Sequence, residues 1–343
     1  MYVATFFSFQ GQLPLLELEL LKSFRRSLLQ IYPNCIFKVL TDPSSVSLIN
    51  ENGFTAFAIE VEPRTLLLDR LRGFRKFIAE LPENSDCFMF DYDMLILKDL
   101  KITEYRVDIA YTVREHLTEQ PINGGIVYYK NNLRSLKILN EIIDSYGSLP
   151  MEKQNWWGDQ LALRKVFERK FGIVKQGVYA TDDTRVLFLD AKKYNFPPFD
   201  MDISLPTQGA NLFIQDHLGK WLNVDLDTLY VCHFKGPRKH LQLQFEWQRK
   251  NKGVYAEYIT RQFYQHIDNI RGGGASYLEG LAQLHPSINE VNDFAVLYYL
   301  NAETISDCET AIDKKIFINH LKKYRDARYN VLLSELPELM GMR

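Results

Sequence analysis

The sequence lacks the features that mark several classes of protein. No run reaches the roughly 18 apolar residues that a membrane-spanning helix needs, and the first residues do not combine a basic start, an apolar stretch and a small-residue cleavage site. We therefore expect neither a membrane span nor secretion by that route. The four cysteines include no C-x-x-C pair, which favours a reducing, cytosolic setting.

The sequence also lacks a large net charge of either sign, because the formal net charge is only −2 over 343 residues. Such a chain has no overall field that would draw it to nucleic acid, so we expect no nucleic-acid partner and only a local anion site. The content of 46% apolar and 24% charged residues is ordinary for a soluble globular protein. We expect one main domain with an extension.

Strand-like and helix-like patterns alternate along most of the chain. Short apolar or β-forming runs predict strands at residues 2–8, 35–41, 54–59, 87–90, 108–113, 125–129, 186–189 and 230–233. Apolar residues spaced three and four apart predict helices at residues 16–28, 66–81, 133–146 and 159–171. The alternation predicts an α/β fold with a mostly parallel sheet, whose ligands lie beyond the carboxyl ends of the strands. Residues 241–343 are mostly helix-like, which predicts a helical C-terminal extension.

Two aspartates interrupt an apolar run directly after the predicted strand at 87–90. They are Asp91 and Asp93, separated by Tyr92 and followed by Met-Leu-Ile-Leu. Burial of unpaired carboxylates would cost several kcal/mol, and a divalent cation such as Mg²⁺ or Mn²⁺ is the simplest compensation. Such a cation could also bridge to the oxygens of a diphosphate. The alternative is a pair of solvated turn residues after a buried strand.

A second polar cluster follows the predicted strand at 230–233. There His233 precedes a Gly-Pro turn and three cations that end with Lys239, and together they predict a compact anion-binding corner. A neutral imidazole could complete a metal site with the two aspartates, and it suits Mn²⁺ better than Mg²⁺. Lys239 could hold a phosphate as a point charge. The alternative is an ordinary surface turn with solvated basic residues.

Four short elements occur in an order that is characteristic of a known group. In chain order they are Asp91-Tyr92-Asp93, Asn123-Gly124-Gly125, Asp159-Gln160, and His233 followed by Gly236 and Lys239 in the pattern H-x-x-G-x-x-K. With these motifs the chain resembles the retaining glycosyltransferases of the glycogenin and lipopolysaccharide galactosyltransferase type, the family 8-like group. The resemblance implies the GT-A fold, with a nucleotide-sugar transferase domain at residues 1–240 and a helical extension at 241–343.

The resemblance also implies a role for each matched residue. The metal, Mn²⁺ or Mg²⁺, would be held by Asp91, Asp93 and His233. The nucleotide-sugar donor would be contacted by Asp91, Arg75, Asn123, Gly124, Gly236 and Lys239. The reacting centre would be lined by Asp159 and Gln160.

Other readings of some of these residues stay open. Arg72 is close enough in sequence to take the role of Arg75. Asp159 could be only the N-cap of the helix that it precedes. The segment 123–125 could be a hairpin turn.

The implied function is metal-dependent transfer of a sugar from a nucleotide-diphosphate donor, a UDP-sugar, with retention, to a hydroxyl of a carbohydrate, lipid-linked or protein acceptor. One alternative is a non-catalytic binding module of the same fold. Another is a sugar nucleotidyltransferase, although the residues after the first strand do not form the glycine-rich loop that such enzymes need. Basic residues between 314 and 328 alternate with apolar ones, so a C-terminal helix could touch a membrane surface or could simply pack with a solvated face.

Overall fold

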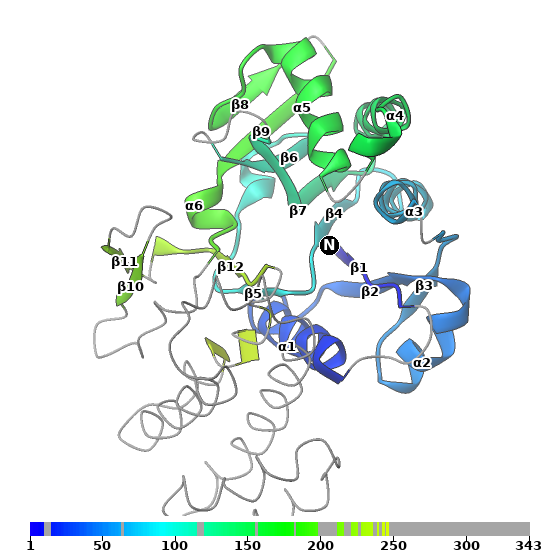
Figure 1. Cartoon of the computed structure of the whole chain (residues 1–343), viewed down its shortest axis with the longest axis vertical. Coiled ribbons are helices and arrows are strands. Elements are labelled where there is room, and N and C mark those ends of the chain that lie inside the picture. The colour runs from blue at the N-terminus through cyan, green and yellow to red at the C-terminus, as the bar shows by residue number, and fades with distance from the viewer. Residues whose placement is uncertain are drawn as a thin grey trace, which may run out of the picture. The chain divides into compact units, whose positions relative to one another are not determined.

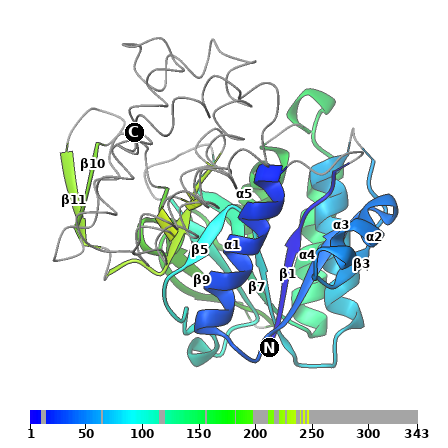
Figure 2. The same cartoon turned by 90° about the horizontal axis from the view of Figure 1, so that it is seen from below.

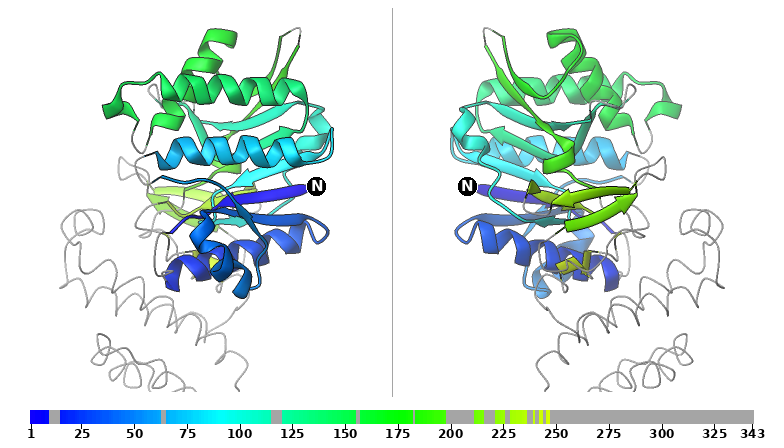
Figure 3. Two further views of the ribbon diagram at one scale, coloured as in Figure 1. Left: turned by 90° about the vertical axis from the view of Figure 1, so that its right-hand side faces the viewer. Right: turned by 90° about the vertical axis from the view of Figure 1, so that its left-hand side faces the viewer.

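The computed structural model describes residues 1–9, 15–62, 65–114, 120–154, 157–181, 183–197, 211–215, 221–225, 228–235, 239, 242–243 and 245–246 (Figure 1). The chain divides into two compact units, and the first consists of Met1–Leu13, Phe24–Phe196 and Leu229–His233. In the second unit, β10 (Asn211–Gln215) and β11 (Trp221–Asp225) form an antiparallel pair, visible as yellow-green arrows in Figure 3. The predicted boundary at residue 240 stays a prediction, because the extension at 241–343 falls almost wholly outside the described residues.

The first unit is built on an eight-stranded mixed sheet with the order β3-β2-β1-β4-β7-β6-β9-β8. Its strands are β1 (Tyr2–Phe6), β2 (Ile36–Thr41), β3 (Ala56–Ala58), β4 (Asp86–Phe90), β6 (Ile109–Val113), β7 (Ile122–Lys130), β8 (Gly177–Ala180) and β9 (Arg185–Asp190). Only β7 and β8 run against the common direction of the others. The predicted α/β architecture with a mostly parallel sheet is thereby confirmed.

Helices cover both faces of this sheet (Figures 1 and 2). They are α1 (Leu15–Ile31), α2 (Val46–Glu51), α3 (Leu66–Glu80), α4 (Leu133–Gly147), α5 (Gly158–Phe171) and α6 (Ala191–Tyr194), with 3₁₀ turns η1 (Pro43–Ser45), η2 (Ile102–Tyr105) and η3 (Met151–Lys153). The alternation of side chains along β4 explains the layers, since successive residues of a strand point to opposite faces. Cys87 and Met89 join the core under α3, α4 and α5, whereas Phe88 and Phe90 pack with Phe24 of α1.

A separate two-stranded ladder is formed by residues far apart in the sequence. β5 (Met94–Ile96) pairs antiparallel with β12 (Val231–His233), and Met94 lies opposite His233. The sequence shows residues 94–97 only as an apolar run, and a three-residue strand is too short for a periodic signal. On its other side β12 forms backbone hydrogen bonds with Phe196, which follows α6. Phe196 N–H donates to Val231 O, and His233 N–H donates to Phe196 O.

Strand β7 differs from its prediction in a way that matters for the site. It begins at Ile122, so the residues 123–125 lie inside a strand and the hairpin-turn alternative is wrong. The pairing with β6 shifts here, because Tyr111 lies opposite Val127 while Thr112 lies opposite Asn123. Such bulges change the direction of side chains and are frequent beside functional sites.

Among the helices of the ranges given above, none is long and apolar enough to cross a membrane.

The carboxyl end of β2 is fastened by one buried carboxylate. Asp42 accepts hydrogen bonds from the hydroxyls of Ser8 and Ser45 at 2.9 and 2.7 Å, and also from that of Ser44. Its other oxygen accepts from Ser45 N–H and caps η1. Burial on its own would raise the pKa of Asp42, but the bonds from the three serines outweigh burial and lower it.

We expect Asp42→Ala to lower the free energy of unfolding by about 1–3 kcal/mol at pH 7, because the buried Ser45 and its neighbours Ser8 and Ser44 lose their acceptor. A carboxylate whose pKa is lowered by folding stabilises the fold above its ordinary pKa of 3.8 and loses that contribution as the pH falls through the folded value. The difference between the two proteins in urea unfolding should therefore narrow from pH 7 to pH 3. An equal difference at both pH values would contradict this assignment.

Candidate functional site

Three potential metal ligands converge at the carboxyl end of β4. Asp91 follows that strand, Asp93 precedes β5, and His233 ends β12. His233 Nε2 lies 3.1 Å from Asp93 Oδ1 and 3.5 Å from Asp91 Oδ2, and one ligand atom from each residue lies within 4.8 Å of the others. Asp93 and His233 are buried, while 28% of the Asp91 side chain is exposed. The cluster is therefore buried on the side of Asp93 and His233 and partly exposed at Asp91.

A buried hydrogen-bond network supports the imidazole from behind. His233 Nδ1 lies 2.7 Å from Asn195 Oδ1. Asn195 Nδ2 donates to Asn123 Oδ1 at 2.6 Å and to Thr112 Oγ1 at 3.0 Å. Asn123 Oδ1 also accepts from Gly125 N–H at 2.9 Å. The side-chain oxygen of Asn123 thus accepts two hydrogen bonds within the protein interior.

Functional side chains pack directly against the backbone of Gly124 and Gly125, where a larger residue would contact them. A Cβ atom at Gly125 would lie 2.8 Å from both Asp91 Oδ2 and His233 Cε1, and 2.9 Å from Met94 Cε. A Cβ atom at Gly124 would lie 3.4 Å from Asp159 Oδ2. The bulge in β7 therefore brings the backbone close to Asp91 and His233. Any residue larger than glycine at position 125 would force these side chains to shift.

The basic residue of α3 that reaches the cluster is Arg70. Its Nη2 donates to Asp91 Oδ1 at 2.6 Å and to Gly124 O at 2.9 Å. Arg75 donates from Nε to Asn140 Oδ1 at 2.9 Å, and Arg72 Nη1 lies 3.3 Å from Asp69 Oδ1. The contact of Arg75 with the donor stays a prediction.

Arg70 is not among the site residues predicted from the sequence, although helical spacing carries a signal for it. Residues 70, 74 and 77 share one face of a helix, and Phe74 and Phe77 are buried in the core. The Arg70 guanidinium lies 5.2 Å from the centre of the Phe74 ring. A cation on that apolar face can reach the sheet, whereas Arg75 lies on a different face.

Asp159 is buried at the start of α5, with 7% of its surface exposed. The helix begins at Gly158 with Trp157 in the N-cap position, so the N-cap alternative for Asp159 is wrong. Its Oδ1 accepts from Gln160 N–H at 2.8 Å. Burial raises the pKa of Asp159, the charge of Arg70 opposes that rise, and the charge of Asp91 adds to it. Asp159 therefore belongs to the same electrostatic cluster as Arg70 and Asp91.

Gln160 is held by a second arginine, Arg114, which is also absent from the residues predicted from the sequence. Arg114 Nη2 donates to Gln160 Oε1 and, at 2.7 Å, to Gln120 O. Burial lowers the pKa of Arg114, and the charge of Asp159 acts in the opposite direction. The arginine stands just beyond the end of β6, where no helical or strand period reveals its direction.

The two remaining candidates lie outside the first unit. Lys239 Nζ lies 3.5 Å from Glu17 Oε2 within the second unit. Gly236 is outside the described residues. The roles of both in binding a donor stay predictions.

Aromatic side chains gather at the same edge of the sheet. Phe7 follows β1, and its ring lies 4.8 Å from that of Tyr92 in an edge-on contact and 5.3 Å from that of Phe9. Phe7 is buried, whereas Phe9 and Tyr92 are half-buried. Tyr92, which separates the two aspartates, therefore presents part of its ring beside the acidic cluster.

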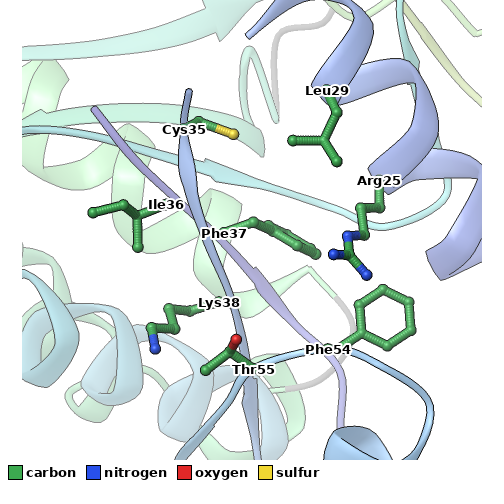
Figure 4. A pocket seen from close by; sticks show the side chains of 8 residues that line it. All are labelled: Arg25, Leu29, Cys35, Ile36, Phe37, Lys38, Phe54 and Thr55. Atoms are coloured by element: carbon green, nitrogen blue, oxygen red, sulfur yellow. The ribbon is translucent and has the colours of Figure 1, made fainter. Parts of the chain in front are cut away.

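A pocket of about 260 Å³ lies elsewhere in the first unit (Figure 4). It is lined by Arg25, Leu29, Cys35, Ile36, Phe37, Lys38, Phe54 and Thr55. Its lining includes the first residues of β2, and β2 runs parallel to β1 and β4. The pocket thus lies toward the amino end of these strands, away from Asp91.

The fold is similar to those of solved glycosyltransferases of distant sequence, while no family model and no curated protein matches the chain. The glycosyltransferase GlyE of Streptococcus pneumoniae TIGR4 matches with a TM-score of 0.37 and 14% identity over 56% of this chain, which spans only 46% of GlyE. A glycosyltransferase involved in glycosylation of the major capsid of PBCV-1 has a TM-score of 0.41 and 11% identity, over 70% of this chain and 98% of the other. The galactosyltransferase LgtC, in complex with donor and acceptor sugar analogs, has a TM-score of 0.39 and 14% identity, over 70% of this chain and 89% of LgtC.

We expect Gly125→Ala to lower the free energy of unfolding by about 1–3 kcal/mol, because its methyl group would overlap Asp91, His233 and Met94. The matched control is Gly147→Ala at the end of α4, where an added Cβ meets nothing within 4 Å. Urea unfolding of both variants measures the effect. Equal stability of the two variants would show that the site tolerates a side chain at residue 125.

Proposed function

We propose that this chain is a metal-dependent glycosyltransferase that moves a sugar from a UDP-sugar to an acceptor hydroxyl, with retention of the anomeric configuration. The observation that carries the proposal is the convergence of Asp91, Asp93 and His233 at the carboxyl end of a central strand. Ligands of open α/β sheets bind at this edge. The order of the four sequence motifs supports retention and the UDP-sugar donor.

The donor atoms of the cluster suit Mn²⁺ best. Two carboxylates provide hard oxygen ligands that either Mg²⁺ or Mn²⁺ accepts, whereas the imidazole nitrogen favours Mn²⁺. Because Asp91 is partly exposed, a diphosphate would have access to a cation held by these three residues. A cation held by Asp91, Asp93 and His233 would supply positive charge to neutralise the departing nucleotide diphosphate.

The neighbouring side chains then have separate tasks. Arg70 is fixed on Asp91 and on the backbone of Gly124, so its charge stands beside the place of the donor. Asp159 and Gln160 face the same edge, and we assign them contacts with the donor sugar. Both are held in place, Asp159 by Gln160 N–H and Gln160 by Arg114. Such fixed geometry is what positions an acceptor hydroxyl close to the anomeric carbon.

The aromatic residues at this edge suit the nucleobase of the donor. Phe9 and Tyr92 are half-buried, and each ring contacts that of Phe7, with the Tyr92 contact edge-on. Stacking of a base on an aromatic ring contributes about 1–3 kcal/mol. We assign Tyr92 the stacking contact, which accounts for a large residue between the two aspartates.

The metal cluster is tested by Asp93→Asn and His233→Gln. We expect either change to reduce manganese-stimulated release of UDP from a panel of UDP-sugars by about 100-fold or more, since each replaces a metal ligand by a neutral amide. Asp183→Asn is the matched control, because Asp183 is an exposed aspartate whose ion pair with Lys137 stabilises little. Thermal unfolding of each variant verifies folding.

Three outcomes decide between the candidate functions. Loss of turnover in the two site variants alone supports the proposal, and the anomeric configuration of the product, read by NMR, tests retention. Failure of the wild-type protein to bind any nucleotide sugar with manganese would overturn it. Binding of UDP and manganese without turnover of any acceptor would identify a non-catalytic module instead.

Tyr92 is tested by its effect on the affinity for UDP. We expect Tyr92→Ala to raise the Kd for UDP in the presence of manganese about tenfold, because it removes the stacking surface. Tyr92→Phe should leave the Kd within a factor of about two, since the ring is kept. Isothermal titration calorimetry measures both, and an unchanged Kd in Tyr92→Ala would exclude stacking on this ring.

A further inference from the structure

The metal-binding ability of His233 depends on which of its ring nitrogens carries the proton. A neutral imidazole has one N–H and one lone pair, and only the nitrogen with the lone pair can bind a cation. In His233 the nitrogen that faces both aspartates is Nε2. The cluster therefore works as a metal site only when the proton resides on Nδ1.

The backbone of the bulge in β7 determines the direction of each hydrogen bond that leads to Nδ1. Gly125 N–H is a donor in every state, so the atom that it contacts on Asn123 must be the carbonyl oxygen. That oxygen is also 2.6 Å from the Asn195 side chain, which must therefore present its amide nitrogen there. The carbonyl oxygen of Asn195 then points at His233 Nδ1, 2.7 Å away, and can only accept.

These hydrogen bonds form a relay from Gly125 through Asn123 and Asn195 to His233, and burial leaves it little freedom to rearrange. Asn195 and Asn123 are 2% and 5% exposed, and Thr112 is fully buried. Thr112 Oγ1 accepts the second hydrogen of the Asn195 amide, so both of its N–H groups are used. The backbone next to Asn195 is fixed to β12 as well, because Phe196 bonds to both Val231 and His233.

We propose that Asn195 is a positioning residue that keeps a proton on Nδ1 of His233, so that Nε2, which faces Asp91 and Asp93, is the nitrogen left to bind a cation. The inference rests on the proposed metal site, and it concerns the Nδ1 side of the ring, which faces Asn195. Partners of this kind that fix a ligating histidine affect metal affinity by about 10–100-fold. Asn195 itself would not touch the metal or the donor.

The experiment reads the protonation of the ring directly. Nitrogen-15 NMR of metal-free protein at pH 8 should show one histidine with protonated Nδ1 whose signals disappear in His233→Gln, which assigns them. In Asn195→Ala the proton should redistribute between the two nitrogens. Binding of Mn²⁺ without nucleotide, followed by electron paramagnetic resonance, should weaken about 10–100-fold in Asn195→Ala.

The control is Thr112→Val, which alters the same buried cluster but leaves Asn123 to orient the Asn195 amide. It should keep Nδ1 of His233 protonated and bind Mn²⁺ within about threefold of wild type. Unprotonated Nδ1 in the wild-type protein would overturn the inference, even if Asn195→Ala fails to fold. So would equal Mn²⁺ affinity in a folded Asn195→Ala. Absence of Mn²⁺ binding by the wild type would overturn the proposed function instead. The nitrogen-15 NMR spectrum would still show whether Nδ1 of His233 is protonated.

Discussion

The antiparallel pairing of β5 with β12 is the contact on which the candidate site depends. It joins Asp93 to His233, which are separated by 140 positions in the chain, because the first residue of one strand lies opposite the last residue of the other. Each strand has only three residues, so neither is stable by itself. Met94, Ile96 and Val231 are buried in the core that also holds Phe24 and Phe90. Hydrophobic burial of these strands thus brings two polar side chains to one point.

The bulge in β7 supplies the second half of the arrangement. Gly125 lets Asp91 and His233 approach the backbone, and its N–H starts the relay that ends on the imidazole. One residue thereby provides both space and direction. A site of this kind can hold a cation without large rearrangement, since its ligands already converge and their supporting partners are buried.

Local sequence patterns predict much of the fold and the acidic half of the site. Helix α3 and strand β4 have clear periods or continuous apolar runs, so their bounds are confirmed within a residue. The direction of β7 is not encoded locally, because strand pairing is decided by packing between distant segments. The same limit explains Arg70 and Arg114, whose roles depend on which side of an element faces the sheet. The motif order brings Asp91 and His233 to notice, but only the short ladder explains how they meet.

The most direct test of the metal cluster is a crystal structure of the protein grown with manganese chloride and UDP, with anomalous diffraction recorded for manganese. We expect one strong anomalous peak, bound by His233 Nε2 and by carboxylate oxygens of Asp91 and Asp93 at about 2.0–2.2 Å, with the diphosphate of UDP on its open side. An ordered manganese ion with UDP at any other place, or one that His233 does not touch, would contradict the proposed centre.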